Sequence, residues 1–523
     1  MNTCLLHIRT TILTVLLGII PFQSISAEVA LPTIIGDHMV LQRDMKAPIW
    51  GWADPQESIV VTIGDQTHST TANADGHWMV KLDPLKVGDP LTMTVAGKNR
   101  IEVKDILVGE VWVCSGQSNM QWSVNQSWNA DLETASANRP EIRLITVGTP
   151  GMQVPLQEFA GKWQLCTPQT VANFSAVGYF FGRQLQDVLN VPIGLIDNAW
   201  GGSSCEAWVR RELLKDNEVY APLLSRWKKT EAQPELRESY QNYEAARLAW
   251  RDQAIAAKKS GQLAPPQPAR PNNQMVTNHR PGNLFNGRLK PVMPFAIRGA
   301  IWYQGEANAS RAYQYRELFP LMIHNWRSDW GQGDFPFYWV QLADYKDEKQ
   351  TPSNSDWAEL REAQTMTEDK LPNTGQAVII DIGEGSDIHP RNKLEVARRL
   401  ARLALVNDYG MKFASDSPRY KSMQAKDGKI ELTFDRVGKG LRTVDKRDAI
   451  GFAISDSPGH WHWAKAKIEG KDKIAVWNDE IKEPVAVRYA WSDNPICNVY
   501  SQDGLPLTPF RTDDWKGITA DNR

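Results

Sequence analysis

The sequence predicts an α/β protein in which a mostly parallel β-sheet, covered by helices on both sides, lies between two β-rich regions. Three observations predict this arrangement. From about residue 105 to residue 411, buried β-prone runs alternate with helical patterns, as they do in parallel sheets. Before and after this region, short β-prone runs follow one another with turn residues between them. The chain of 523 residues is also long enough for several domains.

Composition excludes several classes of protein. The chain has 59 basic and 61 acidic residues, a net charge of −2, and so lacks the basic excess that a nucleic-acid partner requires. Its 42% hydrophobic and 23% charged residues are typical of a folded protein, which excludes wholesale disorder, collagen, coiled coil and a polytopic membrane protein. The 21 Trp residues are unusually many, and Trp often stacks on sugar rings or packs in cores.

The first 27 residues have the pattern of a secretory signal peptide. Arg9 precedes an apolar run at 12–20 that is too short to span a bilayer, and Ser26 and Ala27 are small residues before an expected cleavage at Glu28. No later stretch is long enough to cross a membrane. We therefore expect an exported protein, periplasmic or secreted, without a membrane span.

Residues 28–104 are predicted to form an N-terminal β-domain. Its short β-prone runs are separated by Asp-Pro, Gly-Asp and Asp-Gly turns, which is typical of a small antiparallel β-sandwich. The clearest predicted strands are Ala47–Trp52, Ser58–Ile63 and Leu91–Val95.

Residues 105–411 are predicted to contain the central sheet and its helices. The pattern of apolar residues predicts a helix over Val177–Leu189, and Asn392 followed by Glu395 marks the start of another that ends at Gly410. The predicted buried strands are Glu110–Cys114, Ile142–Val147, Ile193–Ile196, Ile297–Trp302, Phe337–Leu342 and Ala377–Ile380.

Two further segments differ from this alternation. Residues 209–291 are polar, helical over Tyr240–Lys258 and then rich in Pro, and are predicted to be an insertion over the loop end of the sheet. Residues 412–523 regain the β pattern and are predicted to form a C-terminal β-domain, with strands near Lys429–Phe434, Ala449–Ile454 and Val485–Trp491.

Four cysteines follow the predicted signal peptide: Cys114, Cys166, Cys205 and Cys497. Four in a chain of this length do not make a disulfide scaffold, and their spacing fits no zinc motif. Buried thiols and one or two bridges are both compatible with an exported protein, and Cys114 with Cys205 is the first pair to test.

Two candidate sites carry hydroxyl groups and glycines directly after predicted strands. In Cys114-Ser-Gly-Gln-Ser-Asn-Met120, Ser118 is well placed as a nucleophile, with Ser115 as a rival and an ordinary turn as the alternative. In Asn198-Ala-Trp-Gly-Gly-Ser-Ser204, the adjacent glycines allow backbone N–H groups to approach a substrate oxygen, although a tight turn needs glycine equally.

Two further loops contribute polar groups. Gln304 and Glu306 follow the strand that ends at Trp302 and offer a neutral donor and an acid, if they are not simply surface residues. Asp387-Ile-His-Pro390 follows another strand, and His389 is the usual type of base for a serine nucleophile near neutral pH.

Together these motifs resemble the sialate O-acetylesterase family of SGNH-type serine esterases. The matching residues are GQSNM at 116–120, WGGS at 200–203, WYQGEAN at 302–308 and DIHP at 387–390. Other runs, such as FSAVGYFFGRQL at 174–185 and WGQGDFPFYWVQLADY at 330–345, are also similar, so the resemblance extends over nearly the whole mature chain. It implies an SGNH-hydrolase-like three-layer domain between two β-sandwich-like domains.

The resemblance also implies roles for individual residues. Ser118 is the nucleophile and His389 the general base, and the Ser118 N–H, the Gly202 N–H and the Gln304 side chain form the oxyanion hole. The acid departs from the family, because SGNH enzymes generally place Asp three residues before His and Ser386 stands there. Asp387 lies two residues before His389, and i,i+2 residues of an extended segment point the same way, so Asp387 is favoured over Glu306.

The resulting hypothesis is an exported esterase that removes O-acetyl groups from sialic acids and needs no metal or organic cofactor. One alternative is an acetylxylan or other glycan O-acetylesterase, and another is a non-catalytic carbohydrate-binding protein. A glycosidase built on Glu306, Glu384 and Asp387 would leave Ser118 without a role. A sialate enzyme should direct an Arg at the substrate carboxylate, and the candidates are Arg280, Arg298, Arg311 and Arg391. The oligomeric state is open.

Overall fold

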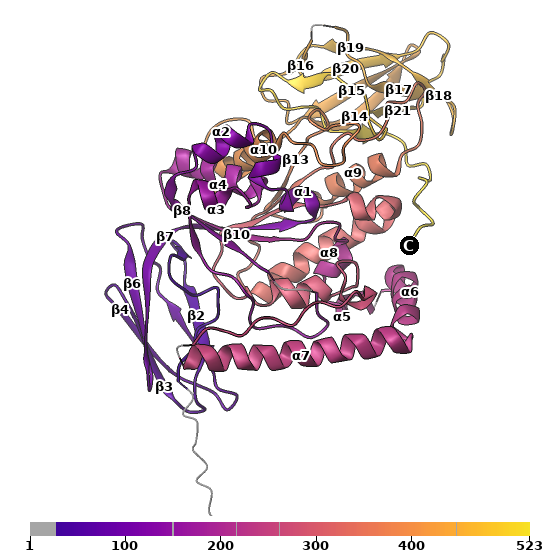
Figure 1. Ribbon diagram of the computed structural model, residues 1–523. Coiled ribbons are helices and arrows are strands. Elements are labelled where there is room, and N and C mark those ends of the chain that lie inside the picture. Colours follow the sequence, from indigo (N-terminus) through magenta and orange to yellow (C-terminus); the bar gives the residue numbers. More distant parts are fainter. Residues whose placement is uncertain (1–27, 149–150, 216, 261, 446) are drawn as a thin grey trace, which may run out of the picture.

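The computed structural model describes residues 28–148, 151–215, 217–260, 262–445 and 447–523 (Figure 1). The predicted signal peptide, residues 1–27, lies outside the described residues. In the described ranges, no helix has the length and apolarity needed to cross a bilayer.

A mixed β-sheet forms the centre of the molecule. Its main strands lie in the order β13-β12-β11-β7-β10-β8-β9, all parallel except β9, which is antiparallel to β8. Chain order reverses around β7, so the loop after β7 opens where ligands bind in sheets of this kind. The bounds are β7 Arg100–Gly116, β8 Arg139–Thr146, β9 Gln164–Cys166, β10 Ile193–Ala199, β11 Gly299–Tyr303, β12 Phe337–Val340 and β13 Thr374–Ala377.

Helices pack on both faces of this sheet. Alternate residues of β7 serve opposite faces: Trp112 belongs to the core that contains residues of α4 (Ala176–Leu189) and α10 (Lys393–Asn407). Val113 belongs to the core on the other face, with residues of α8 (Ala312–Trp330) and α9 (Asp356–Thr367). The shorter helices of this region are α1 Ser118–Gln121, α2 Ala130–Ala135 and α3 Pro168–Val171.

The four described cysteines are free, so the structure contains none of the contemplated bridges among them. Cys114 and Cys205 belong to cores on opposite faces of the sheet. Burial raises the pKa of both thiols, which keeps them protonated and inert.

The N-terminal β region is continuous with the central sheet. β7 pairs with β6 along its first residues and with β10 and β11 along its last, and β1 also pairs with it. The strands are β1 Val40–Gln42, β2 Ala47–Trp52, β3 Ser58–Ile63, β4 Gln66–Thr71, β5 His77–Leu82 and β6 Leu91–Ala96. The predicted strands Ala47–Trp52 and Ser58–Ile63 are confirmed.

The segment predicted as an insertion contains α5 (Glu212–Lys215), α6 (Ala221–Glu231) and the long helix α7 (Pro234–Lys259). α7 extends from the side of α6 to the N-terminal β region (Figure 1). At that end, Lys258 Nζ donates to the carboxylate of Glu158 and, over 2.9 Å, to Thr33 Oγ1.

The C-terminal region carries separate β-sheets around a core of its own. One four-stranded sheet has the order β14-β15-β20-β19, another has the order β18-β17-β21-β23, and β16 pairs with β22. The bounds are β14 Arg419–Lys426, β15 Lys429–Asp435, β16 Leu441–Thr443, β17 Phe452–Ser455, β18 Trp461–Trp463, β19 Lys465–Glu469, β20 Lys473–Trp477, β21 Ala486–Tyr489, β22 Val499–Ser501 and β23 Phe510–Arg511.

The strand predicted at Ala377–Ile380 is displaced. β13 occupies Thr374–Ala377, while the apolar residues after it leave the sheet and pack elsewhere. Val378 and Ile380 join the core of the C-terminal region, whereas Ile379 joins the core under α10. The apolar run therefore reflects two buried surfaces rather than one strand.

Candidate active site

Ser118 is the first residue of α1, directly after the turn that ends β7. The turn depends on Gly116, whose φ is +135° and where a Cβ would lie 2.2 Å from the carbonyl oxygen of Tyr303. The Gln117 N–H donates to that same oxygen over 2.9 Å. Close contact with β11 thus requires glycine and places the Ser118 hydroxyl at the carboxyl end of the central strand.

His389 lies beside this serine although 271 residues separate them. Its Nε2 is 2.9 Å from Ser118 Oγ. The indole of Trp122 stacks on the imidazole, with ring centroids 4.7 Å apart and planes 14° from parallel. The serine and the histidine predicted to act together are therefore held at hydrogen-bonding distance.

The surroundings of His389 favour its neutral form. Burial lowers the pKa of the imidazole, the positive charge of Lys393 lowers it further, and Asp387 opposes both effects. A neutral imidazole with Nε2 against a hydroxyl can accept the proton of that hydroxyl.

Of the two candidate acids, Asp387 lies next to the imidazole. Its Oδ1 is 3.5 Å from His389 Nδ1 and accepts the His389 backbone N–H over 2.9 Å. The Asp387 side chain is 47% exposed. The structure describes both Glu306 and His389, and no oxygen of Glu306 lies within ion-pair distance of the imidazole. Contact with the base thus favours Asp387, as the i,i+2 argument predicts.

Glu306 instead belongs to a polar cluster that it forms with Asn119 and Lys393. Its Oε1 accepts from Asn119 Nδ2 over 2.6 Å, and Asn119 Nδ2 also lies 3.0 Å from the carbonyl oxygen of Ile388. Lys393, which is fully buried, donates to Asn119 Oδ1 over 2.5 Å. Burial raises the pKa of Glu306 and lowers that of Lys393 to about 7.

Sequence reasoning missed Asn119, Trp122 and Lys393. One signal was available for Lys393, which is the first residue of α10. A cation is unfavourable at the positive end of a helix, so a lysine there needs a local partner. Asn119 and Trp122 make their contacts because residues 388–393 pack against the end of β7 in the folded chain. Local sequence patterns do not predict this packing.

The glycine loop after β10 lies against the serine. The Trp200 N–H donates to the Gly116 oxygen over 3.0 Å, and the Gly201 N–H donates to Gln121 Oε1 over 2.7 Å. Gly202 has a φ of +70°, which favours glycine. The loop thus holds Gly202 near the N-terminus of α1, whose first N–H groups lack partners within the helix.

Gln304, predicted as a third donor to the oxyanion, is fully buried. Its Nε2 donates to the Ser203 oxygen over 3.1 Å and to Asn308 Oδ1 over 2.7 Å, while its Oε1 accepts from a tyrosine hydroxyl. Both N–H groups of the amide are thus used inside the protein. Donation to a substrate oxygen requires one of these bonds to be exchanged, so that role stays a prediction.

Ser115, the rival hydroxyl, is fully buried in β7. Its Oγ donates to the Asn198 carbonyl oxygen of the neighbouring strand over 2.7 Å. This hydroxyl therefore joins two strands and is closed to a substrate.

The four arginines considered for a substrate carboxylate all have carboxylate partners within the protein. These pairs are Arg280 with Glu231, Arg298 with Glu110, Arg311 with Glu206 and Arg391 with Glu384. Glu110 also lies in β7 six residues before Gly116, about 20 Å from that end of the strand. Each of the four arginines thus has a carboxylate partner within the protein, and only the Arg391 pair lies in the loop of His389.

No group of three or more His, Cys, Asp or Glu side chains in the described part of the chain is arranged to hold a metal ion. The chemistry that the arrangement can perform is nucleophilic attack by a serine with a histidine base, because these groups are in contact and a loop of N–H donors lies beside them.

Comparison with known proteins identifies similar sequences and a similar structure. Residues 108–239 and 279–404 match the family described as carbohydrate esterase, sialic acid-specific acetylesterase. The chain is 32% identical to a sialate O-acetylesterase from Mus musculus, over 91% of this chain and 93% of that protein, and 29% identical to a sialate O-acetylesterase from Homo sapiens, over 91% of each chain. The crystal structure of a carbohydrate acetylesterase from Xanthomonas citri is similar at 36% identity, with a TM-score of 0.79, over 93% of this chain and all of that one.

Proposed function

The chain belongs to the sialate O-acetylesterase family, and we propose that it removes O-acetyl groups from sialic acids by a Ser-His-Asp mechanism. It is an esterase of the carbohydrate O-acetylesterase class. The observation that carries the mechanism is the 2.9 Å contact between Ser118 Oγ and His389 Nε2 at the carboxyl end of β7.

In the first step, Ser118 Oγ attacks the acetyl carbonyl carbon while His389 Nε2 takes the hydroxyl proton. Asp387 stabilises the imidazolium that forms, from its position 3.5 Å from Nδ1. Collapse of the tetrahedral intermediate breaks the ester bond, and His389 returns the proton to the sugar oxygen. The products are a sugar hydroxyl and acetyl-Ser118.

The negative oxygen of the intermediate needs N–H donors. The Ser118 N–H at the start of α1 and the Gly202 N–H in the adjacent loop fill this role in the proposal, with Gln304 as the third predicted donor. Such a donor is typically worth about 10²–10³ in rate.

In the second step, water attacks the acetyl group and His389 takes one of its protons. The new tetrahedral intermediate releases acetate, and His389 returns the proton to Ser118 Oγ. No metal or organic cofactor takes part in either step of the proposal.

The mechanism is tested by the variant Ser118→Ala. We expect it to fold normally and to release no acetate from an activated acetyl ester, since the hydroxyl at the start of α1 contributes little to stability. Ser115→Ala is the matched comparison, because its hydroxyl lies in β7 and only bonds to a neighbouring strand. Turnover near that of the wild type in folded Ser118→Ala would exclude the mechanism.

The substrate is tested by acetate release from O-acetylated sialic acids and acetylated xylo-oligosaccharides, compared by kcat/KM. Preference for the sialic acids supports the proposal, whereas preference for xylo-oligosaccharides favours the acetylxylan alternative. A folded wild type that releases no acetate from either, yet binds them, would identify a non-catalytic carbohydrate-binding protein.

The proposal extends to architecture and location. We propose that the mixed sheet and its helices form an SGNH-type three-layer domain at 105–411, with an insertion at about 209–291, and that residues 28–104 and 412–523 form β-sandwich-like domains. We further propose export, to the periplasm or outside the cell, after removal of residues 1–27. Sequencing the N-terminus of the mature protein tests this, and a chain that begins at Glu28 is the expected result.

A further inference from the structure

A hollow of about 390 Å³ has two lining residues close in sequence to the loops of the candidate active site. Gln121 lies three residues after Ser118, on α1, and Trp200 directly precedes the glycine loop. The described residues that line it are Gln121, Gly148, Trp200, Tyr243, Arg247, Gln267, Pro268, Arg270 and Arg288. Its volume is that of a typical small-ligand site.

The lining is strongly cationic. Three of the described lining residues are arginines, and none is Asp or Glu. Arg270 and Arg288 both stack on the Trp200 ring, at 5.2 and 5.6 Å from its centroid. Arg288 is anchored by bonds to Asn198 and Val147, whereas Arg270 is exposed. The charge of Arg288 is opposed by the buried carboxyl group of Asp197, so Arg247 and Arg270 are the cations that an acidic ligand meets.

Arg247 supplies the most specific observation. The residue is 1% exposed, and its Nη1 donates to Gln267 Oε1 over 2.7 Å. Its Nε and Nη2 are buried and have no hydrogen-bond partner among the described residues. The same holds for Gln267 Nε2 and the Tyr243 hydroxyl. Buried polar groups are nearly always satisfied, so a group of unpaired donors on one wall indicates a missing acceptor.

We propose that Arg247, with Arg270 at the rim, binds the carboxylate of an acidic acetylated sugar and so presents its ester to Ser118. A guanidinium binds a carboxylate through paired N–H groups, and Arg247 has two that are unused. This inference rests on the proposed function, because it names what orients the substrate at the same serine. Arg247, Gln267 and Arg270 lie between the two ranges that match the family.

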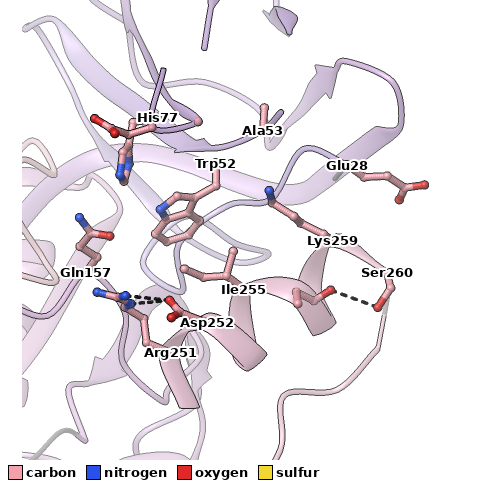
Figure 2. A pocket seen from close by; sticks show the side chains of 13 residues that line it. Glu28, Trp52, Ala53, His77, Gln157, Arg251, Asp252, Ile255, Lys259 and Ser260 are labelled. Carbon is pink, nitrogen blue, oxygen red and sulfur yellow. Dashed lines mark hydrogen bonds and ion pairs between the residues drawn. The ribbon is translucent and has the colours of Figure 1, made fainter. Parts of the chain in front are cut away.

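A second hollow, of about 580 Å³, has a lining that does not suit an acidic ligand (Figure 2). It lies between Trp52 of the N-terminal β region and the end of α7. Arg251 there pairs with Asp252, and Glu28 and Asp75 add two further carboxylates to the wall. Its three carboxylates outnumber its two cations, Arg251 and Lys259. Arg251 is therefore a suitable control, because it lies four residues from Arg247 on α7.

The experiment compares each acidic substrate with its carboxylate methyl ester. O-acetylated N-acetylneuraminic acid and an O-acetylated glucuronic acid are each assayed in both forms by acetate release. For the wild type we expect kcat/KM to be about 10- to 100-fold higher for the free acid of the preferred sugar, the usual range for a hydrogen bond to a charged group. The sugar that shows the preference identifies the source of the carboxylate.

The variants assign this preference to the hollow. In Arg247→Gln and in Arg270→Gln the ratio of acid to methyl ester should fall towards one, and in Arg251→Gln it should keep the wild-type value. Arg247 is buried against Trp250, so Arg247→Gln can fail to fold. In that case the acid-to-ester ratios of the wild type and of Arg270→Gln test the carboxylate site. A wild-type ratio near one, or a ratio that neither variant changes, overturns the carboxylate site.

Failure of this inference is distinguishable from failure of the proposed function. Acetate release with a ratio near one removes only the carboxylate site. If no sugar is deacetylated, calorimetric titration with N-acetylneuraminate and its methyl ester tests the hollow directly. Tighter binding of the free acid, lost in Arg270→Gln, then supports the site without any turnover, and equal binding of both forms refutes it.

Discussion

The ammonium group of Lys393 donates to Asn119 Oδ1 over 2.5 Å at a place where neither side chain is open to water. Asn119 follows Ser118 directly, and its amide nitrogen also lies within bonding distance of the carbonyl oxygen of Ile388, the residue before His389. One buried amide therefore joins the loop of the serine to the loop of the histidine. Glu306 lies on the other side of the same amide, so the joint is held between a cation and a carboxyl group.

The hydrogen bonds of Asn119 predict how its replacement affects activity. Asn119→Leu keeps the approximate volume but removes the bonds to Lys393, Glu306 and the Ile388 oxygen. We expect kcat to fall by about 10- to 100-fold with little change in KM, since a small misplacement of catalytic groups has effects of this size. Steady-state kinetics on an activated acetyl ester measures it. Asn125→Leu, an exposed change in the short 3-10 helix that follows α1 (Val124–Gln126), is the control, and equal losses in both variants would contradict the prediction.

The acid that assists His389 is tested by Asp387→Asn and Glu306→Gln. Asp387 lies 3.5 Å from His389 Nδ1, so its replacement should lower kcat by about 10²–10⁴ with KM nearly unchanged, because the imidazole loses the partner that fixes its tautomer. Glu306→Gln keeps an acceptor for Asn119 and should cost much less. A larger loss of kcat in Glu306→Gln than in Asp387→Asn would transfer the role to Glu306.

The pH dependence of kcat/KM follows from the lowered pKa of His389. The imidazole must be neutral to accept the serine proton, so activity is lost as pH falls through its pKa. Burial and the charge of Lys393 hold this pKa below the ordinary value of 6.5. The acidic limb of the profile should therefore have its midpoint below that value, and a midpoint above it would contradict the assignment.

Replacement of Lys393 should move this limb. The pKa of Lys393 is about 7, so its side chain is charged through the pH range in which His389 titrates. Lys393→Met removes a charge that lowers the pKa of His389, and the acidic limb should shift to higher pH. Lys426→Met, an exposed change on β14, serves as the control. An unshifted limb in folded Lys393→Met would show that the ammonium does not act on the imidazole.

Stability should depend strongly on Gly116. In Gly116→Ala the new Cβ would lie 2.2 Å from the Tyr303 oxygen, at a φ that side chains rarely adopt. We expect a loss of about 2–5 kcal/mol in the free energy of unfolding, combining backbone strain with overpacking. Gly88→Ala is the matched comparison, since nothing lies within 4 Å of its Cβ position. Denaturant unfolding measures both, and similar values for the two variants would refute the argument.

Local pattern was sufficient for many individual elements. The helix start at Asn392 was predicted from its spacing to Glu395, and the Asn392 side chain accepts the Glu395 N–H over 3.3 Å. The apolar spacing of 177–189 matches α4, which spans Ala176–Leu189. These features depend on groups a few residues apart, so short-range chemistry determines them. The family was likewise recognisable, because short motifs carry Ser118 and His389.

The contacts and burial of the site residues required the tertiary structure, because they depend on groups that meet only when distant segments fold together. The sequence could not separate the four arginines first considered from Arg247, since the difference is whether a carboxylate reaches each one. It could not show that Gln304 donates inward, or that Lys393 meets Asn119 across 274 residues. The sequence was thus sufficient to name the candidate reactive groups. Their partners, burial and charge state were decided by long-range packing, which sets the solvation and neighbours of each group.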